Sequence, residues 1–377
     1  MKALIAWRIL THERGRSGLA IGGILVAILL MFLQIGFYMS VPRGGLLFYD
    51  VMNFDLMLTS SAYVFEAQPM SFPRRRLFQA LATPEVVRAV PVYHGSGRWL
   101  NSEGGLARDV FVIGYNPDDP VFKVPELRRH QDLLRQPDTI LIDASSRFEF
   151  GKLEVGRRVE IQQRAVTIGG IYHLGSGFVG LGVAVVSDIN FTRIFPEQGG
   201  LSDINLGLLT LRPGAEPDAA AARLRAILPA DAQVFTRKEL TDHEVNHWVT
   251  NTSTGLIFGF GVIVAVIVGL VILNQTLSTQ ITRQLPQYAT LKAMGYTDRQ
   301  LGGIVVAIAT ILSTVSYIPA FLISIVIYWI IRQATPLPIE MTLARMLTVL
   351  AIAWVMSAMS ALISLRILHR ADPVELF

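Results

Sequence analysis

LIFGFGVIVAVIVGLVIL, at residues 256–273, has no polar side chain at any of its positions. A helix buried in a soluble protein seldom lacks a polar face over such a length. About 20 mostly apolar residues are enough for a helix to cross the roughly 30 Å hydrocarbon core of a bilayer. The stretch therefore predicts a transmembrane helix.

Three further segments share this character. Together with the first they form runs without Asp, Glu, Lys or Arg, at 17–42, 245–282, 300–331 and 346–365. Charged residues make up only 16% of the chain and hydrophobic residues 51%, whereas soluble domains usually carry about a quarter charged residues. We therefore predict four transmembrane α-helices, at 18–41, 251–280, 303–331 and 346–366.

The Lys and Arg residues beside these helices predict their orientation, because short loops rich in them stay in the cytoplasm. The N-terminal segment 1–17, expected as a cytoplasmic amphipathic helix, carries four of them, and the loop 281–302 carries three. The short outer loop 332–345 has them only at its edges. Both termini, including the tail 367–377, are thus expected in the cytoplasm, and 42–250 is expected outside.

The segment 42–250 has the patterns of a large α+β extracytoplasmic domain inserted between the first two transmembrane helices. FDLMLTS (54–60) alternates as a strand does, a helix is expected at 71–84 with Ser71 as its N-cap, and a strand follows. A second strand–helix–strand unit covers 206–236. The two units bracket a middle that is rich in strands and turns, so that two subdomains are possible.

HEVNH, at residues 243–247, matches the H-E-x-x-H pattern of zinc proteases. On a helix, His243 and His247 share a face, and Glu244 beside them suits a general base. A catalytic zinc also needs a third protein ligand, and neither the Gly nor the further His of the extended motif follows. We therefore predict no metal site here and keep a membrane zinc metalloprotease as a minor alternative.

The helix that carries this motif is expected to begin near 237, because Thr236 and Glu239 have the spacing of a capping box. No strong helix breaker follows before residue 251. We therefore expect one continuous helix that runs into the second transmembrane segment.

The stretch RQLPQYATLKAMGYTDRQL (283–301) lies in the predicted cytoplasmic loop. Leu291, Met294 and the apolar side of Tyr288 form one helical stripe, and Gly295 suits the C-terminus of that helix. A short helix between two membrane helices can dock in the groove of a partner and pass on its movement. The alternative is a helical hairpin that lies on the lipid headgroups.

LPQYATLKAMGY (285–296) resembles the coupling segment of FtsX/MacB-type ABC transporter permeases, which form the type VII superfamily, and its wording is especially similar to the DevC branch. By this resemblance the residues that contact an ATPase are Gln287, Tyr288, Leu291, Lys292, Met294, Gly295 and Tyr296. Gln287 stands where the family usually has Glu, so that an ionic contact becomes a neutral hydrogen bond. Further similarities lie in 6–37, FDLMLTS (54–60), SFPRRRLFQAL (71–81), FVIGYNP (111–117), SRFEFG (146–151), SDINFTRIF (187–195) and ADPVELF (371–377).

The resemblance implies a non-catalytic permease subunit of the bacterial inner membrane, with a porter-like outer domain and a homodimeric assembly. Its expected partners are an ABC ATP-binding subunit that holds ATP and Mg²⁺, a periplasmic adaptor and a TolC-like outer-membrane channel. The cargo implied is a lipid-like or amphiphilic molecule, such as a glycolipid, moved by transmission of mechanical force. An FtsX-like signalling protein that controls cell-wall hydrolases is the alternative.

Other features of the sequence agree with an exporter that is driven by a partner. The chain has no G-x-x-x-x-G-K-[ST] pattern and is therefore not expected to bind ATP itself. Much of the basic excess sits at cytoplasmic membrane edges, where anionic lipid headgroups attract it. No basic stripe with interleaved aromatic residues appears, so that nucleic-acid binding is not expected. Apart from Arg366 at the very end of the fourth, no charged residue lies inside a predicted span, which argues against ion coupling. Small-residue pairs that allow close helix packing, within or between subunits, are Gly18/Gly22 and Gly255/Gly259.

Overall fold

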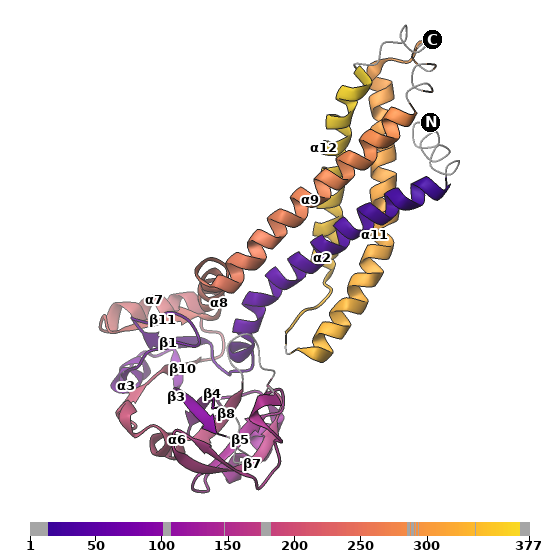
Figure 1. Cartoon of the computed structure of the whole chain (residues 1–377). Helices are drawn as coiled ribbons and strands as arrows, with labels where there is room; N and C mark the ends of the chain where they lie inside the picture. Colours follow the sequence, from indigo (N-terminus) through magenta and orange to yellow (C-terminus); the bar gives the residue numbers. More distant parts are fainter. Residues whose placement is uncertain are drawn as a thin grey trace. The chain divides into compact units, whose positions relative to one another are not determined.

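The computed structural model describes residues 14–100, 107–146, 148–174, 182–284, 287, 290, 292, 294–335 and 337–369. Figure 1 shows its helices and strands. The described residues fall into two compact units. The membrane unit contains those up to Ser40, from Ser253 to Thr335 and from Ile339 onward, and the outer unit contains those from Val41 to Thr252 with 337–338.

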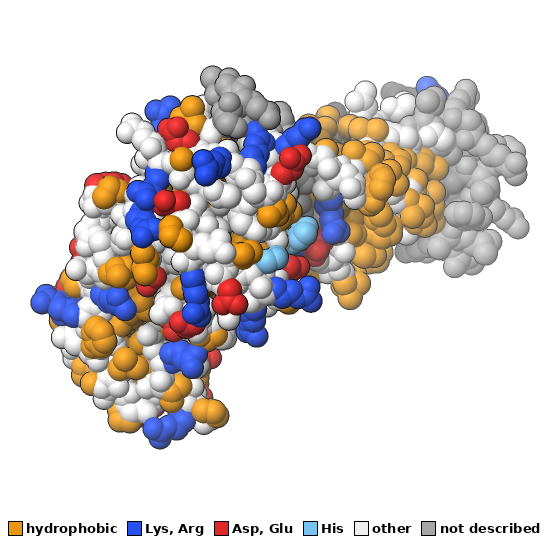
Figure 2. Space-filling model, turned by 90° about the horizontal axis from the view of Figure 1, so that it is seen from below, with side chains coloured by type: hydrophobic (Ala, Val, Ile, Leu, Met, Phe, Trp, Pro, Cys, Tyr) orange, Lys and Arg blue, Asp and Glu red, His pale blue; other side chains and the backbone are white. Residues whose placement is uncertain are grey.

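The membrane unit is built from four helices that are long and apolar enough to cross a bilayer. Aromatic contacts join them, with Phe37 stacked on Phe258 at 5.1 Å between ring centroids. Apolar side chains also point outward, as Ile257 and Phe260 do, both 66% exposed, and Figure 2 shows such side chains crowded over this unit. This is the surface that lipid contact requires. The helices are α2 (Arg14–Asp50), α9 (Ser253–Arg283), α11 (Asp298–Ala334) and α12 (Leu343–His369).

The outer unit contains the two predicted strand–helix–strand units, and their strands interleave. The spatial order is β11-β1-β10-β3, and every neighbouring pair is antiparallel. Both helices of these units contribute to the same buried cluster, which also contains Leu56 and Leu58 of β1, and they therefore cover one face of the sheet. This is the split β-α-β arrangement. Its elements are β1 (Leu56–Ser60), α3 (Arg75–Leu81), β3 (Val86–Leu100), β10 (Leu206–Leu211), α7 (Pro217–Ile227) and β11 (Ala232–Thr236).

The middle of the outer unit forms a closed barrel on the far half of the long strand β3. The order continues β3-β4-β8-β5-β7-β6, and β6 pairs with the end of β3 to close the ring. Trp99 and Phe150 meet edge to face inside it, both buried. The strands are β4 (Arg108–Tyr115), β5 (Thr139–Asp143), β6 (Arg158–Ile161), β7 (Arg164–Tyr172) and β8 (Val183–Ser187). Closure removes the unpaired edges that an open sheet would expose.

Short elements connect these strands and lead back to the membrane helices. After β11 the chain forms α8, whose first turn is held by the predicted capping box, since Thr236 and Glu239 bond each other's backbone N–H groups. The shorter elements are β2 (Phe72–Pro73), α4 (Pro125–Arg129), α5 (Gln131–Leu134), α6 (Asp188–Ile194), β9 (Asp203–Ile204), α8 (Arg237–Asn246) and a π-helical segment (His247–Asn251).

The continuous helix expected from 237 into the second span is wrong. The π-helical segment follows α8, and Thr252 is extended at φ −101° and ψ 144° before α9 begins. Two threonine hydroxyls donate to backbone carbonyls one turn back, from Thr250 to Asn246 and from Thr252 to Trp248. Such side-chain bonds compete with the regular helix ladder, which accounts for the break.

One other helix boundary also differs from the predictions, and one helix extends beyond its predicted span. The helix expected at 71–84 begins only at Arg75, because Phe72 and Pro73 pair with β9 as a strand and Ser71 therefore caps nothing. The helix α2, which contains the first predicted span at 18–41, continues beyond that span through Pro42 to Asp50. A proline removes one hydrogen bond of the ladder, and here burial of Phe48 and Tyr49 in the outer unit sustains the helix beyond it.

Candidate functional site

The predicted coupling segment lies between the end of α9 at Arg283 and the start of α11 at Asp298. The Met294 N–H donates to the carbonyl of Thr290 at 3.0 Å, so that a helical turn ends here. Gly295 then adopts φ +92°, the left-handed conformation with which glycine commonly ends helices. Gly295 thus ends the turn as the sequence predicts.

Only some of the predicted contact residues that the structure describes are exposed. Met294 is 64% exposed. Gln287 is exposed and helical, whereas Lys292 is half-buried. Tyr296 instead packs against the core of the membrane unit. The remaining two predicted contact residues, Tyr288 and Leu291, lie outside the described residues.

Of the predicted small-residue pairs, Gly259 contacts the ring of Tyr38, with 3.4 Å between an added Cβ and the ring. Gly255 is buried in α9. Side chains added at Gly18 and Gly22 would meet nothing within 4 Å. That first pair therefore makes no close helix contact among the described residues, and its role between subunits stays a prediction.

Close packing between helices of the membrane unit also occurs at glycines that were not among the predicted small-residue pairs. An added Cβ at Gly36 would collide with the phenol of Tyr328, and one at Gly269 would lie 2.5 Å from Cε of Met356. Gly36 and Ser40 stand at the four-residue spacing that marks small-residue packing pairs, and so do Ala265 and Gly269, so that a search for such pairs could have found both glycines. Only the large partner side chain across the helix pair shows why glycine is needed there.

The HEVNH motif does not assemble a metal site among the described residues. His243 Nε2 lies 2.9 Å from the carbonyl oxygen of Val64, and His247 stacks on Phe65 with 4.4 Å between ring centroids. Glu244 points into the domain, with no exposed surface, and accepts a hydrogen bond from the Tyr63 hydroxyl. Both imidazoles and the carboxyl group therefore have structural contacts.

We expect the purified chain to carry no stoichiometric zinc and His243→Ala to leave its metal content unchanged, because the residues of the motif already contact protein groups. Metal analysis by mass spectrometry checks this, with His173→Ala as a control outside the motif. Stoichiometric zinc that disappears in His243→Ala but not in His173→Ala would establish a metal site instead.

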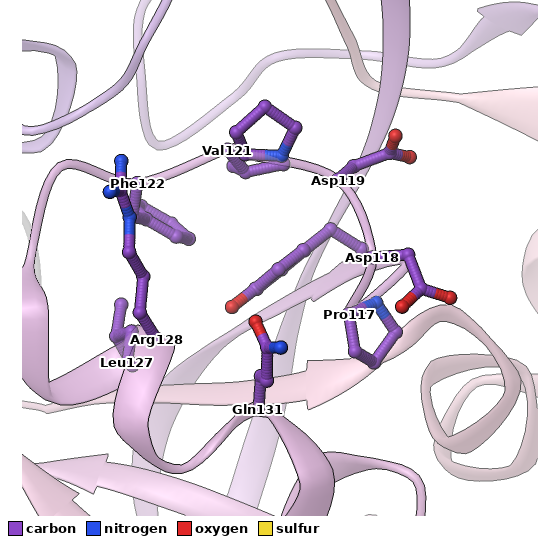
Figure 3. Close-up of a pocket in the computed structure, with 10 residues that line it drawn as sticks. Pro117, Asp118, Asp119, Val121, Phe122, Leu127, Arg128 and Gln131 are labelled. Atoms are coloured by element: carbon purple, nitrogen blue, oxygen red, sulfur yellow. The ribbon is translucent and has the colours of Figure 1, made fainter.

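A small hollow in the outer unit, of about 100 Å³, lies beside α4 and α5. Figure 3 shows that Gln131 points toward its centre, while the carboxylates of Asp118 and Asp119 point away. Pockets that hold drug-sized molecules usually measure about 300–1,000 Å³. The hollow is therefore too small for a lipid-like cargo.

Two family models match the chain. The model of the MacB-like periplasmic core domain matches residues 17–227, more than half of the chain, and that of the FtsX-like permease C-terminal matches residues 259–373. No curated protein matched.

Two solved structures are similar to the chain in its outer part. One is the extracellular domain of the noncanonic ABC-type transporter YknZ from Gram-positive bacteria, at 18% identity and a TM-score of 0.32, covering 48% of this chain and 99% of that one. The other is the periplasmic region of MacB from Actinobacillus actinomycetemcomitans, at 11% identity and a TM-score of 0.35, covering 54% of this chain and 95% of that one.

Proposed function

Because the chain belongs to the family of FtsX/MacB-like permeases, we propose that it is the membrane subunit of an ABC exporter whose ATP is hydrolysed by a separate subunit. The observation that carries the proposal is the layout of the chain. A core domain of the MacB type stands between the first and second of four membrane helices, and the FtsX-like part follows it.

The proposed mechanism is mechanical. Closure of the ATP-binding subunits moves the coupling segment, where Met294 is exposed beside the turn at Gly295. This segment is continuous in sequence with α9, and α9 is continuous with α8 of the outer unit through the π-helical segment. A pull on the coupling segment is thereby passed to the outer domain, which displaces the cargo.

The finer features of the proposal follow from the resemblance to the DevC branch. The cargo is an amphiphile such as a glycolipid, and a second copy of the chain completes the membrane path. A periplasmic adaptor and a TolC-like channel carry the cargo onward from the inner membrane. Gln287, Lys292 and Met294 face the ATP-binding subunit, together with the adjoining residues of the coupling segment.

The topology that this mechanism needs is testable, because the chain has no cysteine and a single introduced cysteine is therefore a unique label. We expect an impermeant maleimide to modify Phe78→Cys in intact spheroplasts and to leave Met294→Cys unmodified; these side chains are 65% and 64% exposed. After permeabilisation both variants become labelled, which controls for reactivity. Modification of both positions from outside would refute the proposal.

An FtsX-like signalling role shares the matched C-terminal model and predicts a different phenotype. A strain that lacks the chain retains an amphiphile in its inner membrane if the chain is an exporter. Unchanged lipids combined with defective cell-wall cleavage identify a signalling protein. Lipid extraction and wall digestion assays on the same strain separate the two roles.

A further inference from the structure

A buried chain of hydrogen bonds crosses the outer unit from α2 to α8. The hydroxyl groups of Tyr49, in the last turn of α2, and Tyr63, after β1, are 2.6 Å apart. Tyr63 donates to Oε1 of Glu244 on α8, and the backbone N–H of Glu66 lies 3.5 Å from Oε2. All four residues are buried, with at most 6% of their surface exposed. Burial of polar groups costs free energy, so that a buried polar network of this kind differs from the apolar packing that is usual in a protein core.

Three side chains hold the same two helices together around this network. The indole of Trp248 lies directly on Gly45 of α2, where an added Cβ would overlap it. Phe65 meets Trp248 edge to face at 5.7 Å. Arg237, at the start of α8, donates to the carbonyl of Tyr49 in the last turn of α2 and to two carbonyls just beyond that helix. The end of α2 and α8 are thus joined within the outer unit by polar and apolar contacts.

The charge in this network is carried by two carboxyl groups, those of Glu66 and Glu244. Burial raises the pKa of Glu244 to about 7, against hydrogen bonds from Tyr63, the Glu66 backbone and Trp248 that lower it. Burial and the charge of Glu244 raise the pKa of Glu66 well above its usual value. Two interacting carboxyl groups titrate as a pair, and this pair keeps a proton near neutral pH.

The other titratable groups around the pair bring no compensating charge. Burial also raises the pKa of the Tyr49 and Tyr63 hydroxyls, and both stay neutral. The pKa of His247 is lowered by burial and by His243. Arg237 donates to backbone carbonyls instead.

We propose that Glu244, through Tyr63 and Tyr49, is a positioning residue that locks α8 to the end of α2. The chain enters the outer unit through the end of α2 and leaves it through α8 and the π-helical segment. With the lock closed, the two connections move as one body. The proposal deepens the proposed function, on which its consequence for transport rests, because a pull on α9 then also displaces α2.

The proton on the carboxyl pair sets the strength of the lock. A folded-state pKa above the unfolded value means that folding takes up a proton, so stability is highest below about pH 4.5 and falls as pH rises toward 7. His94 acts in the opposite sense, because burial lowers its pKa to about 4 and its contribution is lost in acid. A comparison of variants that all retain His94 removes this opposing contribution.

The lock is tested on the full chain in lipid nanodiscs without any partner, so that the outcome does not depend on the proposed transport. Tyr63→Phe and Glu244→Ala are expected to raise amide hydrogen exchange at least tenfold at both 41–50 and 237–246. The matched control is Tyr172→Phe, since Tyr172 is also buried and its hydroxyl donates to the carbonyl of Val183 at 3.1 Å, which joins β7 to β8. It should leave exchange at 41–50 and 237–246 unchanged.

A pH profile separates a positioning role from simple packing. Between pH 5 and pH 8 the melting temperature of the wild-type chain should fall by about 5 °C relative to Glu244→Gln. The Gln side chain retains hydrogen-bonding capacity but cannot ionise, and it should keep exchange at 41–50 low. Unchanged exchange in both Tyr63→Phe and Glu244→Ala, or parallel pH profiles of the wild type and Glu244→Gln, would overturn the proposal.

Discussion

Met294→Glu should abolish copurification of the chain with its ATP-binding subunit and remove at least nine-tenths of the ATPase activity of the complex. The thioether is 64% exposed at the end of a helical turn, where the proposed docking surface would bury it. Truncation of a central interface residue commonly costs about 2 kcal/mol or more, and burial of an unpaired charge adds to that loss. Affinity pull-down and phosphate release measure the two effects.

Gly295 provides an independent test of the same surface. An added Cβ at Gly295 would meet none of the described residues within 4 Å, but the backbone stands at φ +92°. A left-handed conformation costs most residues roughly 1–2 kcal/mol, and Asn tolerates it best. Gly295→Asn should therefore retain binding, and so should the volume-conserving Met294→Leu. If Met294→Glu copurifies as well as Met294→Leu does, the coupling segment does not dock where we propose.

Among alanine substitutions of partly exposed charged residues in the outer unit, Arg237→Ala should be the most destabilising. Its guanidinium donates to the carbonyls of Tyr49, Met52 and Phe54, each at 3.1 Å, and lies 4.0 Å from the centre of the Phe54 ring. Helix ends leave their last carbonyls without intrahelical partners, and Arg237 bonds one such carbonyl of α2, that of Tyr49, together with two carbonyls of the chain that follows the helix. Hydrogen bonds to a charged group contribute about 1.5–3 kcal/mol, so we expect a loss of about 3 kcal/mol.

Thermal unfolding of the full chain in nanodiscs measures this loss as a decrease of about 8 °C in the melting temperature. Arg237→Lys should recover less than half of it, because one ammonium group cannot span three carbonyls as the planar guanidinium does. Arg158→Ala, at an exposed arginine on β6, is the matched control and should change the melting temperature by less than about 1 °C. Equal effects of the alanine substitutions at 237 and 158 would contradict the capping role.

The spacing of residues around Glu244 predicts that its side chain is buried, but the match to the zinc-protease motif drew the interpretation elsewhere. Leu240, Glu244 and Trp248 follow one another at four-residue spacing, and all three are buried. The carboxyl group thus lies on the apolar stripe of its helix, whereas the H-E-x-x-H reading assigned it to a solvent-facing zinc site. The stripe alone predicts burial, but the two tyrosine hydroxyls come from segments about 180 and 195 residues earlier and cannot be inferred from local pattern.

The break between α8 and α9 was not predicted from the sequence, for a related reason. Val249, Thr250 and Thr252 are weak helix formers rather than strong breakers, and on propensity alone the helix continues. The bonds from the Thr250 and Thr252 hydroxyls to the backbone decide the outcome. The free energies of the regular helix and of the broken helix differ little, and contacts with the surrounding structure decide between them. The break is therefore seen only in the folded chain.

The sequence by itself determined the four membrane helices, the inserted α+β domain, the two strand–helix–strand units and the helix stop at Gly295. Each of these follows from local hydropathy, side-chain periodicity or backbone preference, and such preferences act over a few neighbouring residues. The tertiary structure alone decided how the two units interleave into one sheet, how β3 and β6 close a barrel, and why Glu244 is buried beside Tyr63. These depend on contacts between distant segments, whose free energy comes from mutual burial and hydrogen bonding once the chain has folded.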